Sequence, residues 1–247
     1  MSTLTSVATR APVAMLFSRL VLFAVFQALI AAILAGRGTP DAWRASAAWW
    51  PLSVTLANVV CVALLAWLAR AEGKRLRDLY NFGHESRRFG RDLLTLLVAI
   101  VLMGPIAMGP NIGTAILLFG DPETATSMFM QPLPFAVAAV TLVSFPLTIA
   151  FAELPTYFGY VMPRLEKLWG SRWKALAACA LMLGAQHATL PLIFDGRFIV
   201  WRLVMFIPFA LFVGGLVRWR PSMLPWLMGV HAVIDFPVAW MVFAASR

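Results

Sequence analysis

The chain contains long apolar runs, each close in length to a membrane-spanning helix. A helix needs roughly 20 apolar residues to cross the hydrocarbon core of a bilayer, which is about 30 Å thick. Seven such runs cover residues 12–36, 46–69, 93–119, 135–161, 175–193, 197–217 and 222–245. Because backbone polar groups in lipid must be satisfied internally, these runs predict an all-α, polytopic membrane helix bundle of about seven transmembrane helices.

Prolines interrupt two of the predicted helices. The third run contains Pro105 and Pro110, and the fourth contains Pro146 and Pro155. Proline lacks a backbone N–H and clashes with the preceding turn, so we expect these two helices to be kinked or broken. The fifth run is shorter than the others and has Pro191 near its end.

Composition argues against a soluble or nucleic-acid-binding protein. Hydrophobic residues make up 61% of the 247 residues and charged residues only 13%, whereas a soluble domain carries about 25% charged residues. The chain is basic, with 20 Lys and Arg against 11 Asp and Glu. These cations lie in short connections between apolar runs and not on one soluble face. We therefore expect contact with anionic membrane lipids and no nucleic-acid partner.

The distribution of Lys and Arg predicts the orientation in the membrane. Connection 70–91 holds Arg70, Lys74, Arg75, Arg77, Arg87, Arg88 and Arg91, and connection 162–174 holds Arg164, Lys167, Arg172 and Lys174. Loop 120–134 holds two acids and no cation. Since cytoplasmic connections are enriched in Lys and Arg, this alternation predicts a cytoplasmic N-terminus and a C-terminus on the other side.

The apolar runs are expected to form one membrane domain, residues 1–247. No period of 20–50 residues repeats along the chain. The first run is longer than the apolar core of a typical signal peptide and contains Arg19. We therefore expect it to be a membrane helix and not a cleaved signal.

Few ionisable side chains lie inside the apolar runs. A charge near the bilayer centre costs at least about 2.5–3.5 kcal/mol, so such residues tend to face an interior cavity. They are Glu153, His187, His231, Asp235, Arg19 and Arg202. At about 1.5 Å per residue, the acids and imidazoles lie roughly 12–20 Å from the cytoplasmic ends of three predicted helices. This convergence on one slab of the membrane predicts a buried polar site.

The spacing within two helices supports such a site. His231 and Asp235 are at positions i and i+4, so they share one helix face and could act on a common water, carbonyl oxygen or metal ion. Tyr157 stands four residues after Glu153 and could hydrogen-bond it or line the same cavity.

At these residues the chain resembles the CPBP family of intramembrane proteases, also called the Abi or type II CAAX prenyl endopeptidase family. The family motifs run EExxxRG, FxxxH and HxxxN or HxxxD on successive membrane helices. The corresponding segments here are ELPTYFG at 153–159, LGAQH at 183–187 and HAVID at 231–235. The resemblance covers residues 135–240, which would be the core of the domain.

The chain departs from these motifs at three positions. Leu154 replaces the second Glu, Phe158 replaces the Arg, and Leu183 replaces the Phe. Residues 154 and 158 are an i, i+4 pair, so both members of a charged pair have become apolar. Exchanging a complete buried ion pair for well-packed apolar residues can be neutral or favourable. We therefore interpret the double change as structural and Glu153 as the retained chemical residue.

The resemblance implies a metalloprotease-like endopeptidase that cleaves a peptide or protein substrate within or at the edge of the bilayer. Glu153, assisted by His187, would take a proton from the attacking water. His231 would stabilise the oxyanion, while Asp235 would orient its imidazole or, if protonated, donate a hydrogen bond itself. Alternatively, His187, His231 and Asp235 could ligate Zn²⁺ while Glu153 serves as base. The implied location is a bacterial inner (plasma) membrane.

Other interpretations of the same residues remain open. Glu153 could be the structural partner of a buried arginine such as Arg202 or Arg19. A lone intramembrane histidine is commonly a helix-packing hydrogen bonder. A catalytically silent membrane scaffold or immunity-type protein would keep the fold while its motifs decayed. A proton-coupled transporter would also place acids and histidines at the midplane, although the sequence has no paired half-repeats.

Overall fold

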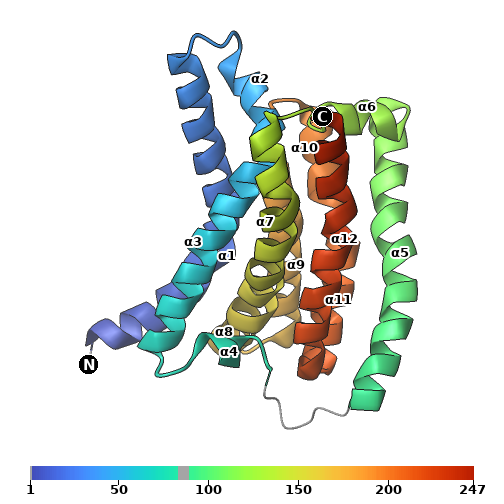
Figure 1. The fold of residues 1–247 in the computed structure, drawn as a ribbon. Helices are drawn as coiled ribbons and strands as arrows, with labels where there is room; N and C mark the ends of the chain where they lie inside the picture. Colours follow the sequence, from blue (N-terminus) through green and yellow to red (C-terminus); the bar gives the residue numbers. More distant parts are fainter. Residues whose placement is uncertain (1, 83–88) are drawn as a thin grey trace.

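The computed structural model describes residues 2–82 and 89–247, with side chains from residue 10 onward, and confirms the all-α prediction for this part of the chain (Figure 1). The longer helices are α1 (Ser2–Gly36), α3 (Trp50–Ala71), α5 (Phe89–Phe119), α7 (Phe135–Leu154), α9 (Arg172–Gln186), α11 (Ile207–Trp219) and α12 (Leu224–Ala245). The shorter helical segments are α2 (Ala42–Ser46), η1 (Ala47–Trp49), α4 (Leu76–Leu79), α6 (Pro122–Ser127), η2 (Pro155–Val161), α8 (Met162–Trp169), η3 (His187–Thr189), α10 (Gly196–Val204) and η4 (Pro221–Met223).

Six helical stretches in the described residues are long and apolar enough to cross a membrane. They are Arg10–Gly36, Ala42–Ala71, Phe89–Phe119, Phe135–Trp169, Gly196–Trp219 and Pro221–Ala245. Each of them overlaps one of the predicted apolar runs, and the longest extends past residue 161 because α7, η2 and α8 follow one another without a break. The protein is therefore a multi-pass integral membrane protein, as the sequence predicts.

The structure differs from the prediction at the run 175–193. Helix α9 has 15 residues and ends at Gln186, and η3 adds only three more before the chain becomes irregular. Pro191 lies just after this end, and proline cannot donate the backbone hydrogen bond that would continue a helix. Helix α9 nevertheless packs into the bundle, against α11 and α1.

Only one of the two proline-rich helices changes its helical geometry at a proline. Helix α5 runs continuously through Pro105 and Pro110, so of the two predicted alternatives, a kink or a break, the break does not occur there. In the fourth predicted helix, Pro146 lies inside α7, and Pro155 begins the wider π-helical turns of η2. Short π-helical segments within membrane and soluble helices often occur at functional sites.

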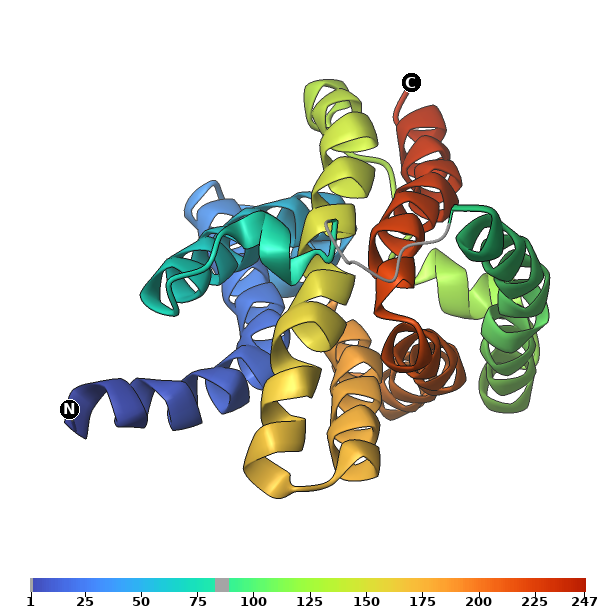
Figure 2. The same cartoon turned by 90° about the horizontal axis from the view of Figure 1, so that it is seen from below.

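Helix α7 is central in the bundle. Seen from below, α7, η2 and α8 lie between α1 and α3 on one side and α11, α12 and α5 on the other (Figure 2). The most extensive helix contacts are those of α7 with α12 and with α3. Residues on different faces of α7 can therefore meet partners from both halves of the bundle.

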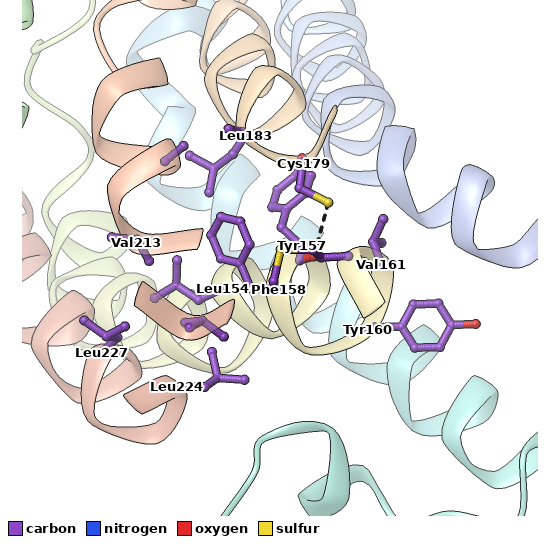
Figure 3. Close-up of a cluster of buried hydrophobic side chains, with 14 of the residues drawn as sticks. Leu154, Tyr157, Phe158, Tyr160, Val161, Cys179, Leu183, Val213, Leu224 and Leu227 are labelled. Carbon is purple, nitrogen blue, oxygen red and sulfur yellow. Dashed lines mark hydrogen bonds between the residues drawn. The ribbon is translucent and has the colours of Figure 1, made fainter. Parts of the chain in front are cut away.

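The two apolar replacements in the first motif lie in the hydrophobic core. Leu154 and Phe158 are each 2% exposed. They pack in one cluster with Leu183 and Val213 from α9 and α11 (Figure 3). This packing agrees with the interpretation that both changes at positions 154 and 158 are structural.

Gly159 allows a close approach between η2 and the last residue of α4. A Cβ at this position would lie 2.4 Å from the carbonyl oxygen of Leu79 and 3.2 Å from Leu224 Cδ2. Because a backbone carbonyl cannot move aside as a side chain can, we expect Gly159→Ala to lower the free energy of unfolding by about 1–3 kcal/mol. Unfolding in mixed detergent micelles would measure this. The control Gly109→Ala, in open space on α5, should not destabilise, and equal stability of the two variants would refute the close approach.

An ion pair joins the end of α3 to α8. Arg164 Nε donates to Glu72 Oε1 at 2.7 Å, and Arg164 Nη2 donates to Glu72 Oε2. The hydrogen bonds from Arg164 hold the pKa of Glu72 below its ordinary value, although partial burial opposes this.

A lowered folded-state pKa gives stability that is present above the unfolded pKa and is lost as the pH falls through the folded pKa. We expect Glu72→Gln to lower the free energy of unfolding by about 1 kcal/mol at pH 7, and by progressively less as the pH falls below the ordinary pKa of glutamate and then through the lowered folded-state pKa. Unfolding at several pH values would measure the difference. Glu123→Gln, at an exposed position in α6, is the matched control. If Glu72→Gln is equally destabilising in acid, the ionised Glu72–Arg164 pair is not the source of the stability.

Candidate functional site

Glu153 lies in the last turn of α7, immediately before the backbone changes to η2. Its side chain is 3% exposed, although it follows a long uncharged segment. A buried carboxylate needs a counter-charge and hydrogen-bond donors, because desolvation of the charge is costly. The surrounding helices supply both.

One carboxylate oxygen of Glu153 is held by a buried polar network. Arg19 Nη2 donates to Glu153 Oε2 at 3.3 Å, and Gln186 Nε2 donates to the same oxygen at 2.7 Å. Arg19 also donates from Nε to Gln186 Oε1 and from Nη1 to Asn58 Oδ1, both at 2.6 Å. The side chain of Arg19 is fully buried. Helices α1, α3 and α9 thus fix the carboxylate of α7 in one orientation.

The other carboxylate oxygen faces α12. Glu153 Oε1 lies 3.5 Å from His231 Nε2, and this nitrogen lies 3.2 Å from Asp235 Oδ2. The i, i+4 pair predicted from the sequence therefore does meet Glu153. His231 Nδ1 and Asp235 Oδ2 are buried, and neither makes an aligned hydrogen bond to another described residue. Both atoms keep hydrogen-bonding capacity for a ligand.

His187 is the first residue of η3, and its ring is fixed on two sides. Its Nδ1 is 2.8 Å from the carbonyl oxygen of Leu183, and its ring centroid is 4.0 Å from that of Phe206. Since a carbonyl oxygen only accepts, Nδ1 carries the hydrogen, and Nε2 is an acceptor in the neutral ring.

The four predicted site residues line one cavity of about 360 Å³. These residues are Glu153, His187, His231 and Asp235. Much of the remaining wall is apolar or aromatic and comes from α5, α7, α10 and α12. A volume in this range suits a small ligand or a short stretch of peptide, because ligand sites occupy about 300–1,000 Å³.

The predicted zinc ligands do not fit a metal site in this arrangement. Within residues 2–82 and 89–247, no three side chains of His, Cys, Asp or Glu converge closely enough to hold a metal ion. His187 offers Nε2, since its Nδ1 is engaged by the Leu183 carbonyl, but the Nε2 of His231 lies between Glu153 and Asp235. The set His187, His231 and Asp235 is therefore not supported as a Zn²⁺ site.

The sequence offered two buried arginines, Arg19 and Arg202, as structural partners of Glu153. The structure pairs Glu153 with Arg19. Arg202 instead donates from Nε to the carbonyl oxygen of His187 at 3.1 Å and from Nη2 to that of Leu190 at 2.5 Å. It therefore holds the backbone around His187.

Sequence reasoning missed two amides in the network and misplaced one tyrosine. Asn58 and Gln186 were not singled out, although each is a polar residue within an apolar run. Tyr157 donates to Gln186 Oε1 at 3.3 Å and makes no hydrogen bond with Glu153. The sequence did contain a signal for both residues: an uncharged amide inside an apolar run, since such groups hydrogen-bond between helices in membranes.

No protein-family model, curated protein or solved structure matches this chain. The resemblance in three short motifs therefore gives no family assignment, and the function has to be argued from the geometry of the site.

Proposed function

We propose that the protein is an intramembrane endopeptidase that hydrolyses a peptide bond within or at the edge of the bilayer. The observation that carries this proposal is the orientation of Glu153. Arg19 and Gln186 hold Oε2, while Oε1 faces His231 in a cavity that His187 and Asp235 also line. A carboxylate with one fixed and one available oxygen is suited to act as a general base.

In the proposed reaction, Glu153 Oε1 takes a proton from a water molecule, whose oxygen attacks the scissile carbonyl carbon. His187 assists by accepting a hydrogen bond from the water at Nε2, its free acceptor. A ring N–H of His231 stabilises the oxyanion, and Asp235, whose Oδ2 lies 3.2 Å from Nε2, orients that ring. The C–N bond then breaks, and the proton held by Glu153 passes to the leaving amine. The products are a new carboxyl group and a new amine.

We also propose a topology and location for the chain. The two chain ends lie at opposite ends of the bundle (Figure 1), which favours an odd number of crossings with α9 as a short seventh crossing. The basic connections favour a cytoplasmic N-terminus. The motif resemblance favours a bacterial inner (plasma) membrane.

Hydrolysis in labelled water tests the proposed reaction. The purified protein, reconstituted in lipid nanodiscs, would be incubated with a library of apolar peptides in H₂¹⁸O. Mass spectrometry should find peptide fragments whose new carboxyl group carries one ¹⁸O. Absence of fragments across the library would overturn the proposal.

A catalytically silent scaffold is the second candidate, and the Arg19–Glu153 ion pair favours it. A buried pair between α1 and α7 has a structural role even without chemistry. The same chain would then need Glu153 for folding but would release no fragments in labelled water.

A further inference from the structure

The candidate cavity is also lined by hydrogen-bond donors that the proposed reaction does not use. They belong to Arg202, Asn111 and Trp50. Two of them surround the ring of Phe129: the guanidinium carbon of Arg202 lies 4.8 Å from its centroid, and the ring of Trp50 lies 5.9 Å from it. Trp201, which holds Asn111, is 6.3 Å from the same ring. Arg202 and Trp50 therefore both lie beside one aromatic side chain. Trp201 links that side chain to Asn111.

Arg202 is a buried cation without an acidic partner among the described residues. It is 6% exposed. Besides the two carbonyl oxygens that it contacts, its remaining nitrogen, Nη1, lies 3.9 Å from the sulfur of Met205, a weak acceptor. A buried charge is normally paired, because an uncompensated one is costly in a membrane interior. The guanidinium can still donate to an anion.

Asn111 and Trp50 add neutral donors. The indole N–H of Trp201 donates to Asn111 Oδ1 at 3.0 Å. This bond occupies the amide oxygen and leaves the NH₂ group of Asn111 as the available donor. Trp50 is 4% exposed, and its buried Nε1 has no acceptor in the described part of the chain. Since buried donors are nearly always satisfied, the unpartnered N–H of Trp50 indicates a ligand that supplies an acceptor oxygen.

We propose that Arg202, Asn111 and Trp50 form a subsite for a carboxylate of the substrate. That the ligand of this subsite is a peptide rests on the proposed function. A carboxylate matches the planar donor geometry of a guanidinium and offers further lone pairs to neutral donors. The aromatic surroundings exclude water, which strengthens such an interaction. The carboxylate can come from an acidic side chain or from the free carboxyl terminus of a peptide.

Binding measurements without turnover test the subsite separately from the reaction. The Glu153→Gln variant in nanodiscs would be titrated with three forms of one apolar peptide. The first has an amidated terminus and no acid, the second has a free carboxyl terminus, and the third is amidated and carries one internal Asp. We expect at least one carboxylate form to bind about tenfold more tightly than the neutral form. The form that gains affinity identifies the source of the carboxylate.

Substitutions in the same background locate the preference. Arg202→Gln should remove it, and Trp50→Phe, which removes the N–H and keeps an aromatic ring at the cavity wall, should reduce it severalfold. Trp67→Phe is the matched control, because Trp67 is 59% exposed and lies outside the cavity. If Arg202→Gln fails to fold, Arg202→Lys takes its place and should weaken the preference, because lysine keeps the charge but lacks the planar donor pair.

Equal affinity for the three peptides, or a preference that survives both Arg202→Gln (or Arg202→Lys in its place) and Trp50→Phe, would overturn the subsite. These outcomes are independent of catalysis. A carboxylate preference without any hydrolysis by the wild-type protein refutes the endopeptidase and keeps the subsite. Hydrolysis by the wild-type protein without a carboxylate preference keeps the endopeptidase and refutes the subsite.

Discussion

Glu153→Gln is expected to lower kcat for peptide hydrolysis by about 10³-fold, with little change in KM. The amide cannot take a proton from water, and a positioned general base contributes about 10²–10⁴-fold to a rate. KM should be nearly unchanged, because Gln at this position can still accept from Arg19 and Gln186 and preserve the cavity. Steady-state kinetics in nanodiscs, with a peptide found to be cleaved by the wild-type protein, would measure both constants.

The matched control is the same substitution at another ion-paired acid. Glu166 pairs with Arg218 and does not line the cavity. We expect Glu166→Gln to keep kcat within about twofold of the wild-type value, since it touches no reacting group. Unchanged kcat in Glu153→Gln would exclude Glu153 as the base, and an equal loss in both variants would indicate a general structural effect.

The long apolar runs were the most predictable part of this fold. Run length alone locates a membrane helix, because lipid leaves the backbone no alternative to internal hydrogen bonding. The run 175–193 is an exception, because its length does not predict the length of its helix. The apolar run continues past Pro191, whereas helix α9 ends at Gln186. Proline cannot donate the backbone hydrogen bond that would extend the helix, so the length of the helix is set by the backbone and not by hydropathy.

Within the site, the residues that could be predicted share a helix or a motif. His231 and Asp235 are linked by helical spacing, and Glu153 was the only acid in its apolar run. The spacing could not show which oxygen of Glu153 would face His231, because the other oxygen is held by side chains from two further helices, α1 and α9.

The network around Arg19 could not be predicted from local patterns. Arg19 is 134 residues from Glu153 and 167 residues from Gln186 in the sequence. Both Arg19 and Arg202 are buried cations in apolar runs, so the sequence offered each as a partner of Glu153. The choice depends on helix packing: α1 packs against α9 and η2, which brings Arg19 to the end of α7.

Arg19→Met is expected to lower the free energy of unfolding by about 3–5 kcal/mol. Methionine fills much of the space of the arginine side chain but leaves the carboxylate of Glu153 buried without its counter-charge, and breaking a buried pair on one side costs about this much. It also leaves Asn58 Oδ1 and Gln186 Oε1 without a donor that they have in the wild-type protein. Unfolding in mixed micelles at neutral pH would measure the loss. Arg37→Met, at the exposed end of α1, should change stability by no more than about 0.5 kcal/mol.

The double variant Arg19→Met/Glu153→Gln separates the charge from the packing. If the cost in Arg19→Met is mainly a stranded carboxylate, removing that charge should recover most of the lost stability, with a coupling free energy of about 2–3 kcal/mol. Additive losses would instead mean that Arg19 stabilises the bundle through Asn58 and Gln186, independently of Glu153. The cycle also bears on the first motif. A complete pair at positions 154 and 158 can become apolar without a stranded charge, whereas the buried carboxylate of Glu153 is accompanied by an arginine from a distant helix.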